Sequence, residues 1–155
     1  MREGNPRPGS PPSSLRAGGK KHAGRLILYV DGASRGNPGP AAWGVWSPSG
    51  LAEARAIGVT TNNVAEWQGF LAALEVAAGQ GVSDVEIRAD SELVVKQFRG
   101  EYRVKAEHLK AYVDEARRRA AHFGRFAVHH VPREENREAD ALANGALDEA
   151  GKAGR

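Results

Sequence analysis

Four acidic residues stand where the sequence changes from one structural pattern to another. Asp31 follows a run of apolar residues, and Asp90 follows an alternating strand pattern. Glu66 and Asp140 fall near the starts of two helical patterns. The carboxyl ends of parallel strands meet at one edge of an open α/β sheet, so these side chains can converge there. Crowded carboxylates repel one another, and a pair of divalent cations with all-oxygen ligands, Mg²⁺ or Mn²⁺, relieves that repulsion.

Each of these acids also has a purely structural explanation. Asp31 precedes a glycine, and this pair commonly forms a turn. Glu66 comes three residues after Asn63, as the second member of a helix capping box does. Asp90 suits a helix cap, and Asp140 suits the positive end of a helix dipole. Taken singly these roles are favoured, and only the joint placement indicates a metal site.

The segments around the four acids read as an α/β domain. The order of three strands, a helix, a strand, two helices, a strand and a helix predicts a mixed five-stranded sheet. Three antiparallel strands are followed by two parallel ones, with helices on both faces. The helix at 105–123 is expected to be the longest. Strands are expected at 26–30, 41–47, 52–59, 85–89 and 126–131, and helices at 64–78, 91–98, 105–123 and 136–147.

The folded domain is expected to span residues 25–150. Residues 1–24 are rich in proline, glycine and serine, which predicts a disordered basic tail, and residues 151–155 are expected to form a flexible C-terminus. The chain carries a net charge of +3, but residues 1–25 hold six basic residues and one acidic residue, so the remainder carries −2. The tail either strengthens binding to phosphate backbones or is a neutral extension.

The composition excludes several kinds of chemistry. The chain has no cysteine, which rules out disulfides, thiol catalysis and cysteine-ligated metals. It has no apolar run of the roughly 20 residues that a membrane-spanning helix needs. These features fit a reducing compartment, and we expect a cytoplasmic, monomeric protein.

Five motifs in order resemble the type 1 ribonuclease H family over nearly all of residues 25–150. Any one of them is a loose pattern, but together they form a specific signal. They are Tyr29-Val30-Asp31-Gly32-Ala33-Ser34, Gly36-Asn37-Pro38-Gly39-Pro40, Thr60-Thr61-Asn62-Asn63-Val64-Ala65-Glu66, Ala89-Asp90-Ser91-Glu92-Leu93-Val94 and Asn136-Arg137-Glu138-Ala139-Asp140-Ala141-Leu142-Ala143.

The resemblance implies an endonuclease that hydrolyses the RNA strand of RNA–DNA hybrids and leaves 5′-phosphate and 3′-hydroxyl ends. It implies two divalent ions in the site when substrate is bound. The catalytic residues and metal ligands it implies are Asp31, Glu66, Asp90 and Asp140. The residues expected to contact the substrate are Gly32, Asn37, Thr61, Asn62, Asn63 and Ser91. The asparagine and threonine residues have turn formation and helix capping as their structural alternative.

Two departures identify the compact subgroup of that family. The basic insertion that many members carry between the second and third helices is replaced by residues 99–105, so substrate affinity is expected to rest on Arg99, Arg103 and Lys105. The loop before the last helix lacks the family's histidine, and Arg133 is the predicted substitute, a cation near the scissile phosphate.

Three other functions stay open. The chain could be a weakly active or non-catalytic module that binds hybrids, a different nuclease such as a junction resolvase, or an accessory domain of a polymerase complex. Retention of all four acids argues against a pure binding module, because clustered carboxylates without cations repel a phosphate backbone. The Asn-Asn-x-x-Glu element at 62–66 favours the hybrid-cutting branch over the resolvases.

Overall fold

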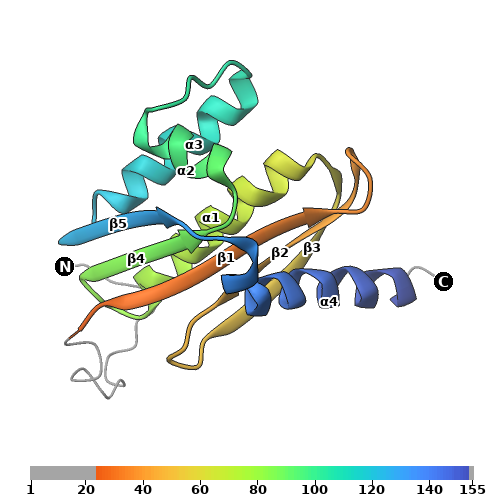
Figure 1. Cartoon of the computed structure of the whole chain (residues 1–155), viewed down its shortest axis with the longest axis horizontal. Coiled ribbons are helices and arrows are strands. Elements are labelled where there is room, and N and C mark those ends of the chain that lie inside the picture. Colours follow the sequence, from red (N-terminus) through yellow and green to blue (C-terminus); the bar gives the residue numbers. More distant parts are fainter. Residues whose placement is uncertain (1–23, 154–155) are drawn as a thin grey trace.

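A computed structural model describes residues 24–153 and shows a mixed five-stranded sheet in the order β3-β2-β1-β4-β5 (Figure 1). β1 pairs antiparallel with β2 and parallel with β4, and β5 continues the parallel half. The predicted fold is confirmed. The strands are β1 (Leu26–Ser34), β2 (Gly39–Trp46), β3 (Ala52–Thr60), β4 (Asp84–Ala89) and β5 (Arg125–His130), and the helices are α1 (Asn62–Gly79), α2 (Glu92–Arg99), α3 (Glu107–Ala120) and α4 (Arg137–Ala153).

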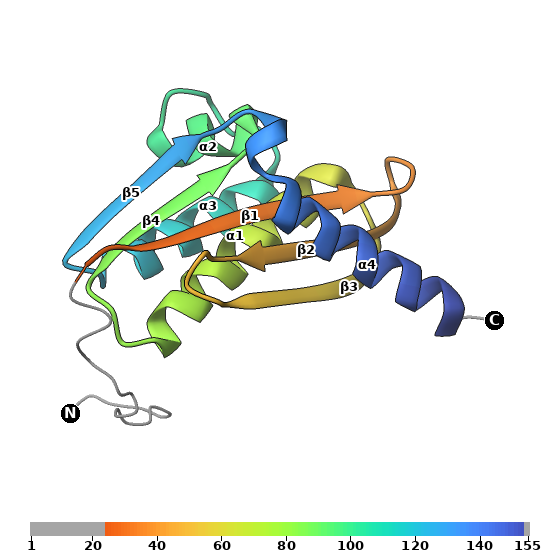
Figure 2. The same cartoon turned by 60° about the horizontal axis from the view of Figure 1, so that its bottom comes forward.

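The helices divide between the two faces of the sheet (Figure 2). α1, α2 and α3 share one apolar core with the sheet, in which Leu28, Val85 and Ile87 are fully buried. α4 lies on the opposite face and packs on β1, β2 and β3. Successive residues of a strand point to opposite faces, so each strand of the antiparallel half can serve both layers.

β1 is longer than predicted, which changes the setting of Asp31. The parallel pairing with β4 stops at Val30 and Ala89, but the antiparallel pairing with β2 continues as far as Ser34. Asp31 therefore lies inside a strand, and the prediction that it closes the strand in a turn is wrong. The reason is that β1 keeps one hydrogen-bonded neighbour after it loses the other.

The helix starts also differ from prediction. Thr61 caps α1, and its side chain accepts the N–H of Val64, so the predicted capping box between Asn63 and Glu66 is wrong. Ser91 caps α2 by accepting the N–H of Val94, which leaves Asp90 free of that task. In both helices a side-chain hydroxyl caps the first turn, so neither Glu66 nor Asp90 is needed as a helix cap.

The prediction that the third helix is the longest is wrong. α3 has 14 residues, whereas α1 has 18 and α4 has 17. α3 starts at Glu107 without a side-chain cap and ends at Ala120, after which residues 121–123 form a turn just before Gly124. α4 continues to residue 153, so residues 151–153 of the predicted C-terminal extension are helical, and the tail predicted at 1–24 lies almost entirely outside the described residues.

Within residues 24–153, every helix is too short or too polar to cross a membrane.

Gly44 allows α4 to lie directly against β2. A Cβ on Gly44 would collide with the carbonyl oxygen of Ala139 and would come within 2.9 Å of the Ala143 nitrogen. Both contacts are to helix backbone, which cannot rotate aside as a flexible side chain can. The missing side chain at Gly44 therefore sets the distance between the sheet and the helix that carries Asp140.

Gly44→Ala is expected to destabilise the protein by about 1–3 kcal/mol, the usual cost of forcing extra volume into a packed interface. Urea unfolding measures this change. The matched control is Gly145→Ala on α4, where an added Cβ meets nothing within 4 Å. It should stabilise the protein by up to about 1 kcal/mol, because alanine is the better helix former. Equal stability of Gly44→Ala and the wild type would contradict this account.

Candidate active site

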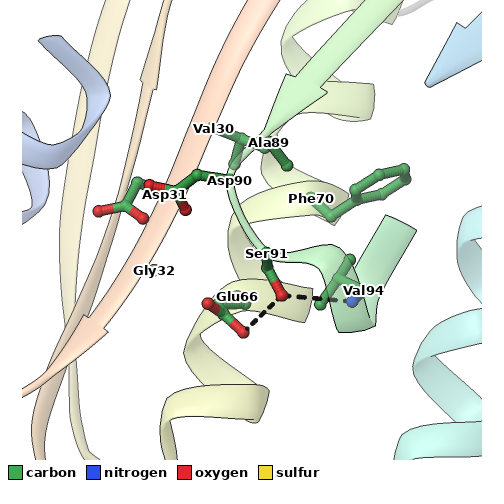
Figure 3. A pocket seen from close by; sticks show the side chains of 9 residues that line it. All are labelled: Val30, Asp31, Gly32, Glu66, Phe70, Ala89, Asp90, Ser91 and Val94. Carbon is green, nitrogen blue, oxygen red and sulfur yellow. Dashed lines mark hydrogen bonds between the residues drawn. The ribbon is translucent and has the colours of Figure 1, made fainter. Parts of the chain in front are cut away.

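Asp31 and Asp90 lie side by side at the end of the parallel pairing. They directly follow Val30 and Ala89, the last pair in register between β1 and β4. Figure 3 shows the two carboxylates next to each other at the sheet edge. Asp31 is only 9% exposed, so its side chain is largely removed from water.

Glu66 reaches the same edge from α1. A Cβ on Gly32 would collide with the backbone of Ala65 and Glu66, so glycine at this position allows the start of α1 to approach β1. The Ser91 hydroxyl donates to Oε1 of Glu66 at 3.0 Å (Figure 3). Because Ser91 directly follows Asp90, this bond ties the α1 acid to the loop that carries the β4 acid.

Asp140 comes from the opposite layer, in the first turn of α4. Its backbone N–H donates to the carbonyl of Asn136 at 3.1 Å. Asn136 is fully buried, and its Nδ2 donates to the carbonyl of Val30 at 2.9 Å, beside Asp31. The start of α4 is thus fastened to β1 where the site begins. Sequence reasoning missed this bond, since its partners are 106 residues apart and no local pattern indicates it.

The four acids are close enough to perturb one another electrostatically. Burial, assisted by the neighbouring Asp90 and Asp140, raises the pKa of Asp31 to about 9. Burial also raises the pKa of Glu66 to about 7; the bond from Ser91 opposes this rise and the charge of Asp90 adds to it. The fold therefore concentrates acids where their ionised forms are poorly stabilised by the protein itself.

The donor set fits a hard divalent cation, although the protein does not complete a cage for one. Among residues 24–153, no three His, Cys, Asp or Glu side chains converge closely enough to hold an ion by themselves. Mg²⁺ is typically bound by one or two carboxylates, with water and substrate phosphate oxygens as its other ligands. Carboxylates that are close but not convergent are compatible with such partial coordination.

The other residues singled out from the sequence gather mainly around the same edge. The N–H of Asn62 donates to Oδ1 of Asn37 at 3.0 Å, which joins the loop after β1 to the start of α1. The Asn62 side chain and the charge of Arg133 both act against the rise in the pKa of the Glu66 carboxyl. Arg99 instead donates to the carbonyl of Val128 at 2.6 Å and braces α2 against β5.

Known proteins resemble this chain over most of its length. A family model described as reverse transcriptase-like matches residues 30–146. A ribonuclease HI of Halobacterium salinarum is 44% identical over 147 residues, which are 92% of this chain and 74% of that protein. A ribonuclease H1 structure from the same organism superposes with a TM-score of 0.76 at 46% identity, covering 81% of this chain and 99% of that one.

Two further structures share the fold. The N-terminal ribonuclease H domain of Rv2228c from Mycobacterium tuberculosis has a TM-score of 0.78 at 39% identity, covering 84% of this chain and 99% of that one. The present chain spans 36% of the full Rv2228c protein, which is named as bifunctional. LC11 ribonuclease H1, solved in complex with an RNA/DNA hybrid, has a TM-score of 0.74 at 40% identity, covering 81% of this chain and 98% of that one.

Asp31→Asn is expected to weaken the pH dependence of stability in the metal-free protein. The Asp31 pKa is about 9 in the folded chain and 3.8 ordinarily, so between these values the folded state keeps a proton that the unfolded state releases. Wild-type stability therefore falls as pH rises through this window. With EDTA present, the wild-type Tm should fall between pH 5 and pH 8 by at least about 3 °C more than the variant's. Parallel Tm curves would contradict the raised pKa.

Proposed function

This chain belongs to the ribonuclease H family and is a ribonuclease H, and we propose that it hydrolyses the RNA strand of RNA–DNA hybrids through Asp31, Glu66, Asp90 and Asp140. The observation that carries this proposal is the gathering of these acids at one sheet edge, where burial and, after it, the neighbouring Asp90 and Asp140 raise the pKa of Asp31 to about 9. The complex of LC11 ribonuclease H1 with an RNA/DNA hybrid supports the substrate class. We further propose a monomer acting in the cytoplasm, in keeping with the absence of cysteine.

The rim of the site offers groups suited to a hybrid duplex. Asn37 and Asn62 are joined by a hydrogen bond beside Glu66, and Thr61 caps the start of α1 there. The wide, shallow minor groove of an A-like duplex exposes 2′-hydroxyls and base edges to such side chains. Free N–H groups at a helix start also suit a phosphate. Asn63 and Ser91 complete the proposed substrate-binding set, whereas Gly32 contributes by letting α1 approach.

The four carboxylates would hold Mg²⁺ or Mn²⁺, and two such ions bound with substrate would supply charge stabilisation at the scissile phosphate and a more acidic attacking water. Asp31 is close enough to interact with both Asp90 and Asp140, so it is placed to bind the same cations as either neighbour. Ser91 holds the Glu66 carboxylate in one orientation toward the rim. No side chain has to form a covalent bond, and the products are a 5′-phosphate and a 3′-hydroxyl.

Arg133 is proposed as the cation that replaces the family's loop histidine. It lies in the short turn before α4 and is exposed, and its charge reaches the Glu66 carboxyl. A guanidinium stays protonated at every working pH, so it cannot shuttle a proton as histidine can. Its proposed part is electrostatic: it stabilises negative charge on the phosphate or on the departing strand.

Purified full-length chain should cut the RNA strand of a labelled RNA–DNA hybrid in Mg²⁺ or Mn²⁺, and should leave double-stranded DNA, double-stranded RNA and four-way junctions uncut. Asp31→Asn should lower kcat by more than about 100-fold, beyond what loss of an outer-shell partner costs. The control is Asp114→Asn on the exposed face of α3, which should cleave normally. Tight hybrid binding without cleavage in either metal would favour a binding module.

Arg133→Ala is expected to lower kcat about 10-fold, which corresponds to about 1.4 kcal/mol of lost transition-state stabilisation. Arg133→Lys keeps the charge and should retain most of the activity. Single-turnover cleavage of the hybrid compared with steady-state turnover shows whether the loss lies in hydrolysis or in product release. An Arg133→Ala enzyme with wild-type kcat would make this arginine structural.

A further inference from the structure

The Asn144 side chain hydrogen-bonds both the Asp140 side chain and a group outside the site. It lies one turn after Asp140 on α4, and its Nδ2 donates to the Asp140 carbonyl at 3.0 Å and to Oδ1 of the Asp140 carboxylate at 3.2 Å. Its Oδ1 accepts from Nη2 of Arg35 at 3.2 Å. The amide thus connects the α4 acid to the loop that follows β1.

The amide of Asn144 can stand in only one orientation between these two neighbours. A carboxylate requires a donor and a guanidinium requires an acceptor, so exchanging the amide oxygen and nitrogen would place like groups against each other at both ends. Asp at this position could not donate, and Lys could not accept. The positive charge of Arg35 also polarises the amide and makes its N–H groups better donors to Asp140.

Arg35 is itself held from two sides. Its backbone N–H donates to the carbonyl of Pro40 at 2.8 Å, which closes the loop. Its guanidinium pairs with Asp148 at 2.9 Å, one further turn along α4. Asp140, Asn144 and Asp148 therefore form a row on one face of the helix, and Arg35 spans the last two.

Asp140 needs such a support more than Asp31 and Glu66 do. Asp31 is held by burial and Glu66 by the Ser91 hydroxyl, whereas Asp140 is exposed and faces a like charge. Resting on the proposed function, we propose that Asn144 is a positioning residue that orients the Asp140 carboxylate toward Asp31, and that Arg35 fixes the Asn144 amide. An exposed network of this kind adds little to stability, so its effect should appear in turnover.

Asn144→Ala should lower kcat about 10-fold, as removal of an outer-shell partner usually does, with an unchanged KM for the hybrid. Its Tm should not fall, because alanine is a better helix former than asparagine. Asn144→Asp should lose more activity than Asn144→Ala, because it adds a carboxylate beside Asp140. The control is Glu149→Gln, which breaks an exposed pair with Lys152 on the same helix and should cleave normally. A wild-type kcat in Asn144→Ala, or a loss confined to KM, would overturn the proposal.

A double-mutant cycle tests the part played by Arg35. Arg35→Ala should lower kcat in the wild-type background and cause no further loss in Asn144→Ala, because it acts through the amide. An equal loss in both backgrounds would overturn this step.

A measurement without substrate or metal separates this proposal from the proposed function. The Asn144 side-chain amide protons, assigned by their absence in Asn144→Ala, should exchange slowly with water in NMR spectra of the full chain and exchange faster in Arg35→Ala. Fast exchange in the wild type would overturn the positioning role. Absence of hybrid cleavage by a wild type whose amide is protected would instead refute the proposed function alone.

Discussion

Crowding of acidic side chains at one end of the parallel strand pair is the constraint on which the rest of the structure depends. Ionised carboxylates in a partly buried place repel one another, and only rigid supports can hold them there. Two glycines supply that rigidity from opposite faces of the sheet. Gly32 lets the backbone of α1 touch β1, and Gly44 lets the backbone of α4 touch β2. A Cβ at either position would move one acid away from the others.

The sequence patterns predicted the order of helices and strands, because that order follows from hydrophobic periodicity. They also predicted the edge at which the acids meet, because β1 and β4 are parallel and end at the same side of the sheet. They did not place Asp31 inside β1, since the end of a strand depends on how far each neighbour extends. The predicted cap of α1 was Asn63, whereas the observed cap is Thr61; the sequence could not separate the two because both residue types cap helices well. Contacts such as Asn136 with Val30 join distant segments and leave no local pattern.

Two arginines beside the short connection between α2 and α3 donate to backbone carbonyls. Arg99 donates to the carbonyl of Val128, and Arg117 donates to the carbonyls of Gln97 and Phe98 at the end of α2. Both guanidinium groups are thus engaged in holding the short connection between α2 and α3 against the core. Of the residues expected to grip the substrate from this segment, Arg103 and Lys105 are exposed.

The charge balance makes cation binding and substrate binding dependent on each other. Residues 26–155 carry −2, and their four proposed catalytic acids face the position that a phosphate backbone would occupy. Phosphate oxygens would complete the coordination that the carboxylates leave unfinished, and bound cations would remove the repulsion that phosphate would meet. Each ligand should therefore raise the affinity for the other by the same factor. Carboxylates that lie near one another without fully enclosing a cation suit this mutual dependence. A closed cage of protein ligands would leave no coordination position for the substrate phosphate.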